Sequence, residues 1–126
     1  MYKKFRWMFF LMAVLFCTAC GSKKTQYLSI AVTSYNDNIS PENGMTINVL
    51  KYDFKNDPVI VGSVPYTSQY PLAVYDESDN CIYYSAKSSG TKGDQLWQYN
   101  IETKEEKQLT DSLFAINSLR DRKSVV

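Results

Sequence analysis

The stretch that decides the fold is QLWQYNIETKEEKQLTD, residues 95–111. Its first part, Gln95–Ile101, combines aromatic and apolar side chains with single polar residues, which is typical of a β-strand. The polar run Glu102–Glu105 predicts a turn, and Lys107–Thr110 predicts a second strand. This strand pair cannot bury its own apolar side chains, so it must belong to a larger sheet structure.

The rest of the chain has the same character, and no stretch keeps a helical period of 3.6 residues. Four short strands between residues 72 and 110, separated by polar turns, predict an antiparallel meander. Within it, Cys81–Ala86 carries apolar residues at both odd and even positions, which predicts a strand covered on both faces. The fold class is therefore all-β. The first two strands of the meander are predicted at residues 72–75 and 81–86, and three further strands are predicted before it, at residues 27–32, 45–54 and 59–64.

Two short internal echoes indicate a repeat. Lys51–Phe54 (KYDF) is echoed 47 residues later by Gln98–Ile101 (QYNI), and Pro71–Val74 (PLAV) is echoed 42 residues later by Leu113–Ile116 (LFAI). A period of about 40–45 residues with four strands per unit is typical of a propeller blade. We predict a partial β-propeller of about two four-stranded antiparallel blades after an N-terminal signal peptide. The alternative is an isolated β-sandwich or small barrel.

Three motifs in the second blade add a family resemblance. CIYYS (Cys81–Ser85), LWQYNI (Leu96–Ile101) and QLTD (Gln108–Asp111), with a glycine-containing loop between the first two, resemble the repeats of TolB-like β-propellers. Bacterial lipoproteins with such repeats are similar in layout. The resemblance covers about residues 45–119, and it is weakest in the first blade, which is degenerate.

The propeller interpretation requires more strands than this chain supplies, because a closed ring needs about 4–8 blades. Ser112–Leu119 (SLFAINSL) is expected to begin a further blade, and residues 27–120 are interpreted as incomplete blades. Asp121–Val126 (DRKSVV) matches the translation of a common sequencing adapter, so we interpret it as an adapter-derived tail on an N-terminal fragment of a longer protein. A genuine polar tail is the alternative. Four residues are expected to cover the next blade: Ile82, Tyr84, Trp97 and Tyr99.

The N-terminus has the order of a secretory signal peptide. Basic residues among the first six precede ten apolar residues, Trp7–Phe16, and the small residues Thr18 and Ala19 follow. The apolar run is too short to span a bilayer, although an uncleaved membrane anchor remains the alternative. We therefore interpret residues 1–19 as a signal peptide and residues 20–26 as a polar tether.

The sequence Cys17-Thr18-Ala19-Cys20 resembles the lipobox of bacterial lipoproteins, with Cys17 standing where leucine is usual. This resemblance implies cleavage after Ala19 and a diacylglyceryl group on the sulfur of Cys20. The predicted lipidation site is therefore Cys20, and the predicted location is extracytoplasmic, with a lipid anchor in a bacterial membrane. The alternative is an ordinary cleavage site with an incidental cysteine.

Charge and composition exclude several functions. Of the 14 Lys and Arg residues three lie within residues 1–19, which leaves 11 against 13 acidic residues and a net charge of −2. This balance argues against a nucleic-acid partner. The chain has no histidine, which excludes histidine-based catalytic triads and histidine metal sites within it. We predict no cofactor, no metal site and no catalytic residue, and we expect Cys81 to be buried and inert.

These observations favour a membrane-anchored cell-envelope lipoprotein whose propeller is a binding or scaffold module for protein or glycan, not an enzyme. The alternative is an N-terminal fragment of an extracytoplasmic propeller enzyme, a hydrolase or lyase, with catalytic residues beyond residue 126. A truncated product without function is the third interpretation.

Overall fold

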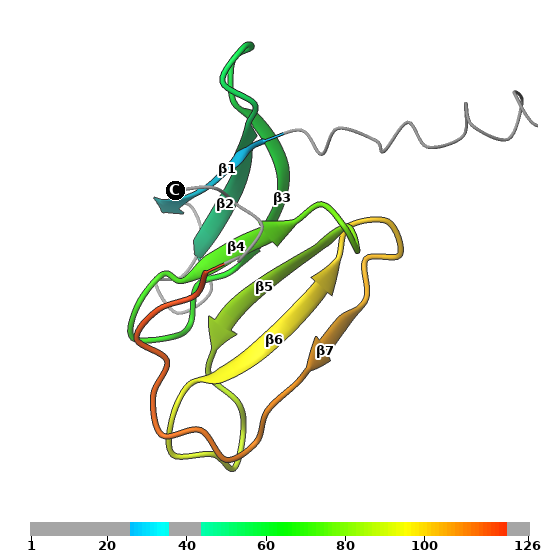
Figure 1. Ribbon diagram of the computed structural model, residues 1–126. Helices are drawn as coiled ribbons and strands as arrows, with labels where there is room; N and C mark the ends of the chain where they lie inside the picture. Colours follow the sequence, from blue (N-terminus) through cyan, green and yellow to red (C-terminus); the bar gives the residue numbers. More distant parts are fainter. Residues whose placement is uncertain (1–25, 36–43, 121–126) are drawn as a thin grey trace, which may run out of the picture.

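The computed structural model describes residues 26–35 and 44–120, and in these residues it contains seven β-strands and no helix. All pairings between neighbouring strands are antiparallel, so the all-β prediction is confirmed (Figure 1). The strands are β1 (Leu28–Tyr35), β2 (Met45–Tyr52), β3 (Val59–Pro65), β4 (Ala73–Asp76), β5 (Cys81–Ala86), β6 (Gln95–Asn100) and β7 (Glu106–Gln108).

The strands form two separate sheets. The first sheet has the order β1-β2-β3, and the second is the predicted meander with the order β4-β5-β6-β7. The first sheet thus has three strands among the described residues, where we predicted a blade of four. A bulge at Val61 of β3, opposite Val49 and Leu50 of β2, shifts the register within this sheet.

The echo between Lys51–Phe54 and Gln98–Ile101 corresponds to a shared local structure. Asp53 follows β2, and its Oδ1 accepts hydrogen bonds from the backbone N–H groups two and three residues later, both at 2.9 Å. Asn100 ends β6, and its Oδ1 accepts the corresponding pair of bonds, also at 2.9 Å. The two backbone bonds hold the pKa of Asp53 down at about 2. The echo therefore marks two equivalent Asx turns, each starting a hairpin.

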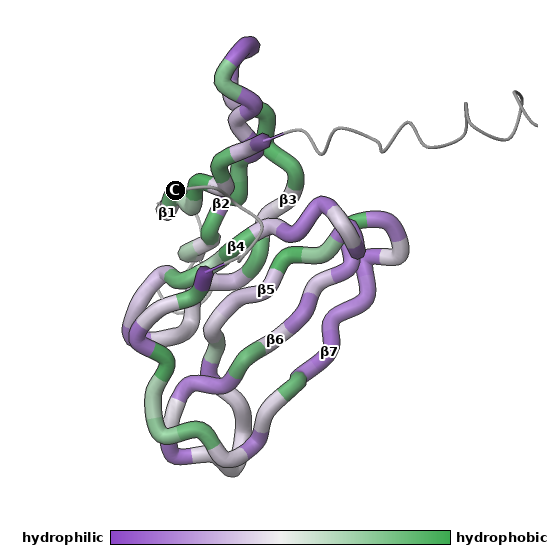
Figure 2. Tube along the Cα trace, viewed as in Figure 1, coloured by the Kyte–Doolittle hydropathy of each residue, from purple (hydrophilic) through white to green (hydrophobic). Residues whose placement is uncertain are grey.

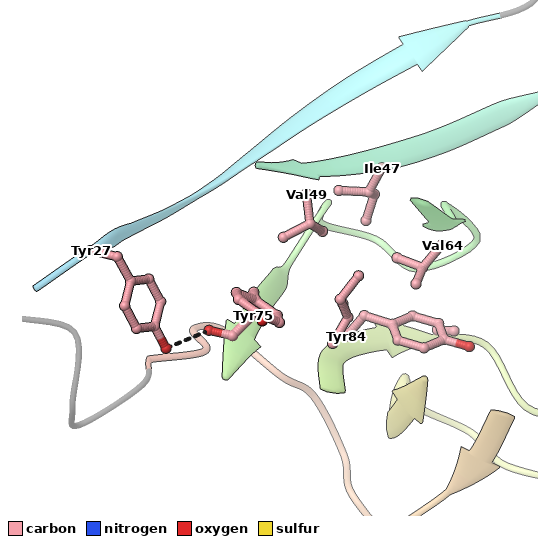
Figure 3. Close-up of a cluster of buried hydrophobic side chains, with 8 residues drawn as sticks. Tyr27, Ile47, Val49, Val64, Tyr75 and Tyr84 are labelled. Carbon is pink, nitrogen blue, oxygen red and sulfur yellow. Dashed lines mark hydrogen bonds between the residues drawn. The ribbon is translucent and has the colours of Figure 1, made fainter. Parts of the chain in front are cut away.

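The two sheets pack face to face, with β4 against β1 and β2 and with β5 against β3. Figure 2 shows hydrophobic stretches in β2, β3 and β5 and hydrophilic turns at the ends of the strands. In Figure 3 the side chains of Ile47, Val49 and Val64 point from the first sheet toward the second. The predicted cover on both faces of β5 is confirmed, because five of its six side chains are buried.

The prediction that Ile82, Tyr84, Trp97 and Tyr99 cover the next blade is wrong. Ile82 and Tyr84 are buried in the core shared with the first sheet, and Trp97 and Tyr99 pack against that core. Cross-strand pairing places all four residues on one face, as alternation predicted. Alternation alone cannot say which neighbouring element covers that face.

A polar clamp joins the two sheets beside the core. The hydroxyl of Tyr27 donates to the carbonyl oxygen of Tyr75 at 3.2 Å (Figure 3). The same hydroxyl accepts the backbone N–H of Glu77 at 3.0 Å. Ser29 Oγ accepts the backbone N–H of Tyr75 at 2.9 Å, and Lys51 forms an ion pair with Glu77. We call Tyr27, Ser29, Lys51, Tyr75 and Glu77 the inter-sheet clamp. The inter-sheet clamp fixes the position of β4 against the first sheet.

The segment Ser112–Leu119 forms no strand, contrary to the prediction. A strand needs a backbone partner, and the backbone of Leu113 is instead bonded by the side chain of Gln95. Figure 1 shows this segment, in orange to red, passing the start of β6 and the end of β5 and running toward the start of β4.

The clamp yields a stability prediction. Tyr27→Phe removes the oxygen that bridges Tyr75 and Glu77 while it keeps the buried ring, so a buried carbonyl and an N–H group lose their partner. We expect the free energy of unfolding to fall by about 1–3 kcal/mol. Urea unfolding followed by the fluorescence of Trp97 measures it.

Tyr52→Phe is the matched control, because no hydrogen bond joins the Tyr52 hydroxyl to another described residue. It should change the free energy of unfolding by less than about 0.5 kcal/mol. Equal effects of the two substitutions would contradict the role of the clamp.

Candidate functional site

The most elaborate polar structure lies at the end of the second sheet where β6 starts, and Gln95 is its centre. This side chain is fully buried. Its Oε1 accepts the hydroxyl of Thr110 at 2.9 Å and the backbone N–H of Leu113 at 3.2 Å. Its Nε2 donates to the carbonyl oxygens of Gly93 and Leu113, both at 3.0 Å. The amide thus pairs with Leu113 in the way that a neighbouring strand would.

A close backbone approach holds the next residue, Phe114, against Gly93. A Cβ atom on Gly93 would lie 2.2 Å from the carbonyl oxygen of Phe114, so only glycine fits there. Phe114 is 90% exposed, whereas Ile116 two residues later is buried. Phe114 therefore points outward from a backbone that is fixed on both sides.

A pair of buried serines lies at the same end of the second sheet, where β5 ends and β6 starts. The hydroxyl oxygens of Ser68 and Ser85 are 2.9 Å apart, and both lie within hydrogen-bond distance of the Tyr70 carbonyl, at 2.5 and 3.1 Å. These bonds attach the connector between β3 and β4 to the end of β5. They satisfy hydroxyl groups that would otherwise be buried without partners.

These three segments surround an open hollow of about 390 Å³, which we call the loop-end hollow. Within it, the carboxylate of Asp94 accepts the backbone N–H of Gln69 at 2.9 Å. No ion pair joins Lys87 or Lys92 to another residue in the described part of the chain. Two lysines and one aspartate make the hollow net positive. Its lining residues are Ser68, Gln69, Lys87, Lys92, Gly93, Asp94, Phe114 and Ala115.

A second polar cluster lies on the face of the second sheet that points away from the first sheet. Tyr83 hydrogen-bonds the carboxylate of Asp79, and Gln98 Nε2 donates to Tyr83 Oη at 3.1 Å and approaches Cys81 Sγ at 3.4 Å. The hydrogen bond to Asp79, together with burial, raises the pKa of Tyr83 to about 12. Burial likewise raises the pKa of the Cys81 thiol. Cys81 is therefore buried, as predicted, and its thiol is protonated at neutral pH.

The structure places the other residues singled out in the sequence as follows. Cys20 and the signal peptide lie outside the described residues. The loop between β5 and β6, which contains Ser88–Asp94, is a loop as predicted. Across residues 26–35 and 44–120, no group of three or more carboxylate or cysteine side chains could hold a metal ion, and no helix is long and apolar enough to cross a membrane.

Comparison with protein-family models, with curated proteins and with solved structures finds no match to this chain. The function is therefore argued from its residues alone.

No local sequence pattern predicts the loop-end hollow. The sequence predicts Gln95 at the start of a strand, but the burial of its side chain depends on Leu113, which is 18 residues away. Gly93 and Phe114 likewise meet only through the fold. The sequence offered one signal, the conjunction of two loop glycines and a lysine in SSGTKGD with the apolar segment LFAI.

The Gln95 network yields a prediction about local opening. Gln95→Leu keeps the size of the side chain but removes its amide, so Thr110 and the Leu113 backbone lose their partners. We expect the amide hydrogen of Leu113 to exchange at least about tenfold faster. Gln69→Leu, at an exposed position nearby, should leave that exchange rate unchanged. Equal rates in the Gln95→Leu protein and the unaltered protein would contradict the assignment.

The Tyr83–Asp79 bond yields a pH prediction. Because the folded pKa of Tyr83 is raised, the neutral hydroxyl stabilises the fold below the ordinary tyrosine pKa of about 10, and this contribution is lost as the pH rises toward 12. In Asp79→Asn, the pKa of Tyr83 should fall from about 12 toward the ordinary value. NMR titration of tyrosine labelled at Cζ measures it, with Asp57→Asn as an exposed control. A Tyr83 pKa unchanged in Asp79→Asn would show that burial alone causes the shift.

Proposed function

We propose that this chain is a membrane-anchored cell-envelope lipoprotein whose two sheets are part of a TolB-like β-propeller that serves as a binding or scaffold module for protein or glycan. The anchor is a lipid on Cys20, and the sheets lie outside the cytoplasm. The observation that carries the module is the face-to-face packing of two successive antiparallel sheets joined by one connector. Successive blades of a propeller are also antiparallel sheets that pack face to face.

The outer faces of both sheets support the propeller part of the proposal. On the first sheet, Leu28, Val32 and Ile60 are exposed on the side away from the core. On the second, Val74 and Leu96 lie half-buried on the side away from the first sheet. A blade inside a ring has a neighbour on each face, so both faces need apolar side chains.

The loop-end hollow supports the binding part of the proposal. Buried polar bonds hold its walls in place, and two lysines, one aspartate and one phenylalanine are among its lining residues. A few convergent polar groups on a rigid scaffold are typical of a ligand site. The anchor itself is supported by the order of charges, apolar residues and small residues before Cys20.

Metabolic labelling tests the lipid anchor. Cells that express the full chain are fed a clickable fatty acid, and the label on the purified protein is quantified. We expect strong labelling of the unaltered chain and its loss in Cys20→Ser, because the Cys20 sulfur is the attachment point. Cys17→Ser is the matched control and should keep the label. Equal labelling of the Cys20→Ser protein and the unaltered chain would refute the lipoprotein proposal.

A further inference from the structure

We propose that the loop-end hollow binds a carboxylate-bearing sugar, such as a hexuronate unit of an envelope glycan. This inference rests on the proposed function as a binding module and names the ligand class of its site. It combines three features of the hollow: uncompensated positive charge, an aromatic ring held outward, and a carboxylate with one oxygen still available.

The positive charge selects an anion. Lys87 and Lys92 line the hollow from the two ends of the loop between β5 and β6, and neither is paired with a carboxylate of the described residues. Asp94 offsets only one of the two charges, and its carboxylate is already oriented by the Gln69 N–H group. The mature chain is acidic overall, so this local excess of positive charge contrasts with the rest of the molecule. A carboxylate between the two ammonium groups would form charge-assisted hydrogen bonds.

The aromatic ring selects a partner with a flat apolar face. Phe114 is 90% exposed, the highest value among the exposed large apolar residues of the described chain. Its exposure does not come from a loose segment, because Gln95 binds Leu113 and Gly93 contacts the Phe114 carbonyl. The ring face carries partial negative charge and attracts the polarised C–H groups of a pyranose ring.

The remaining groups suit sugar hydroxyls. Asp94 uses Oδ2 for the Gln69 N–H group, which leaves Oδ1 to accept a hydroxyl hydrogen. The volume of about 390 Å³ lies in the range of small-molecule sites. An acidic peptide fits less well, because extended peptides bind along sheet edges or grooves, and this hollow lies between three loops.

The test compares two sugars that differ only in the carboxylate, methyl glucuronide and methyl glucoside. Each is titrated into the full chain in detergent micelles, and amide NMR shifts report binding. We expect the glucuronide to shift the amides of Lys87, Gly93, Asp94 and Phe114, and the glucoside to bind at least about tenfold more weakly. Added salt should weaken the binding of the glucuronide.

Two substitutions locate the binding in the hollow. Lys92→Gln removes one ammonium group and Phe114→Ala removes the ring, and each should weaken the binding of the glucuronide about tenfold. Lys107→Gln is the matched control, since Lys107 is an exposed lysine on β7 that does not line the hollow. Its affinity should equal that of the unaltered chain.

The proposal is overturned if the glucuronide causes no shifts at millimolar concentration, if both sugars bind equally, or if an acidic peptide binds more tightly than the glucuronide. Labelling of Cys20 is independent of these results. A protein that is labelled but does not bind the glucuronide would retain the lipoprotein function and lose only this ligand.

Discussion

The structure depends on the burial of one face of each sheet against the other. Ile47, Val49 and Val64 of the first sheet meet Ile82 and Tyr84 of the second, and all five are nearly or fully buried. Neither a three-stranded nor a four-stranded sheet of this length has another way to remove that face from water. The inter-sheet clamp adds direction to this non-directional attraction, because its hydrogen bonds form at only one offset of β4 along the first sheet.

The packing of the two sheets and the sequence echo disagree about which strand of the second sheet corresponds to β2. The echo and the two Asx turns relate the end of β2 to the end of β6, the third strand of the second sheet. In space, β2 lies against β4, the first strand of that sheet. Blades related by rotation about a ring axis would place equivalent strands opposite one another. The first sheet is therefore not a regular copy of the second, in keeping with its three strands in the described part and with its degenerate sequence.

Buried polar side chains hold in place the loops around the loop-end hollow. Gln95, Ser68 and Ser85 are buried, and each finds partners on a segment distant in sequence. Such groups are costly when unpaired, so they fix the three loops in one arrangement. The backbone that carries the exposed side chains of Lys87, Lys92 and Phe114 is consequently held in position. The cluster of Asp79, Tyr83 and Gln98 likewise links polar side chains on the face of the second sheet that points away from the first.

The sequence by itself determined the all-β class, the positions of the seven strands within a few residues, the meander and the two faces of β5, because alternation and turn residues are local properties. It also determined that Ile82, Tyr84, Trp97 and Tyr99 share a face. Only the tertiary structure decided which sheet covers that face, because any neighbouring sheet could offer similar apolar side chains. It also decided that Ser112–Leu119 is not a strand, and that Gln95, Gly93 and Phe114 meet at one hollow. Those contacts join residues far apart in the chain, and no local pattern encodes the long-range pairing that brings them together.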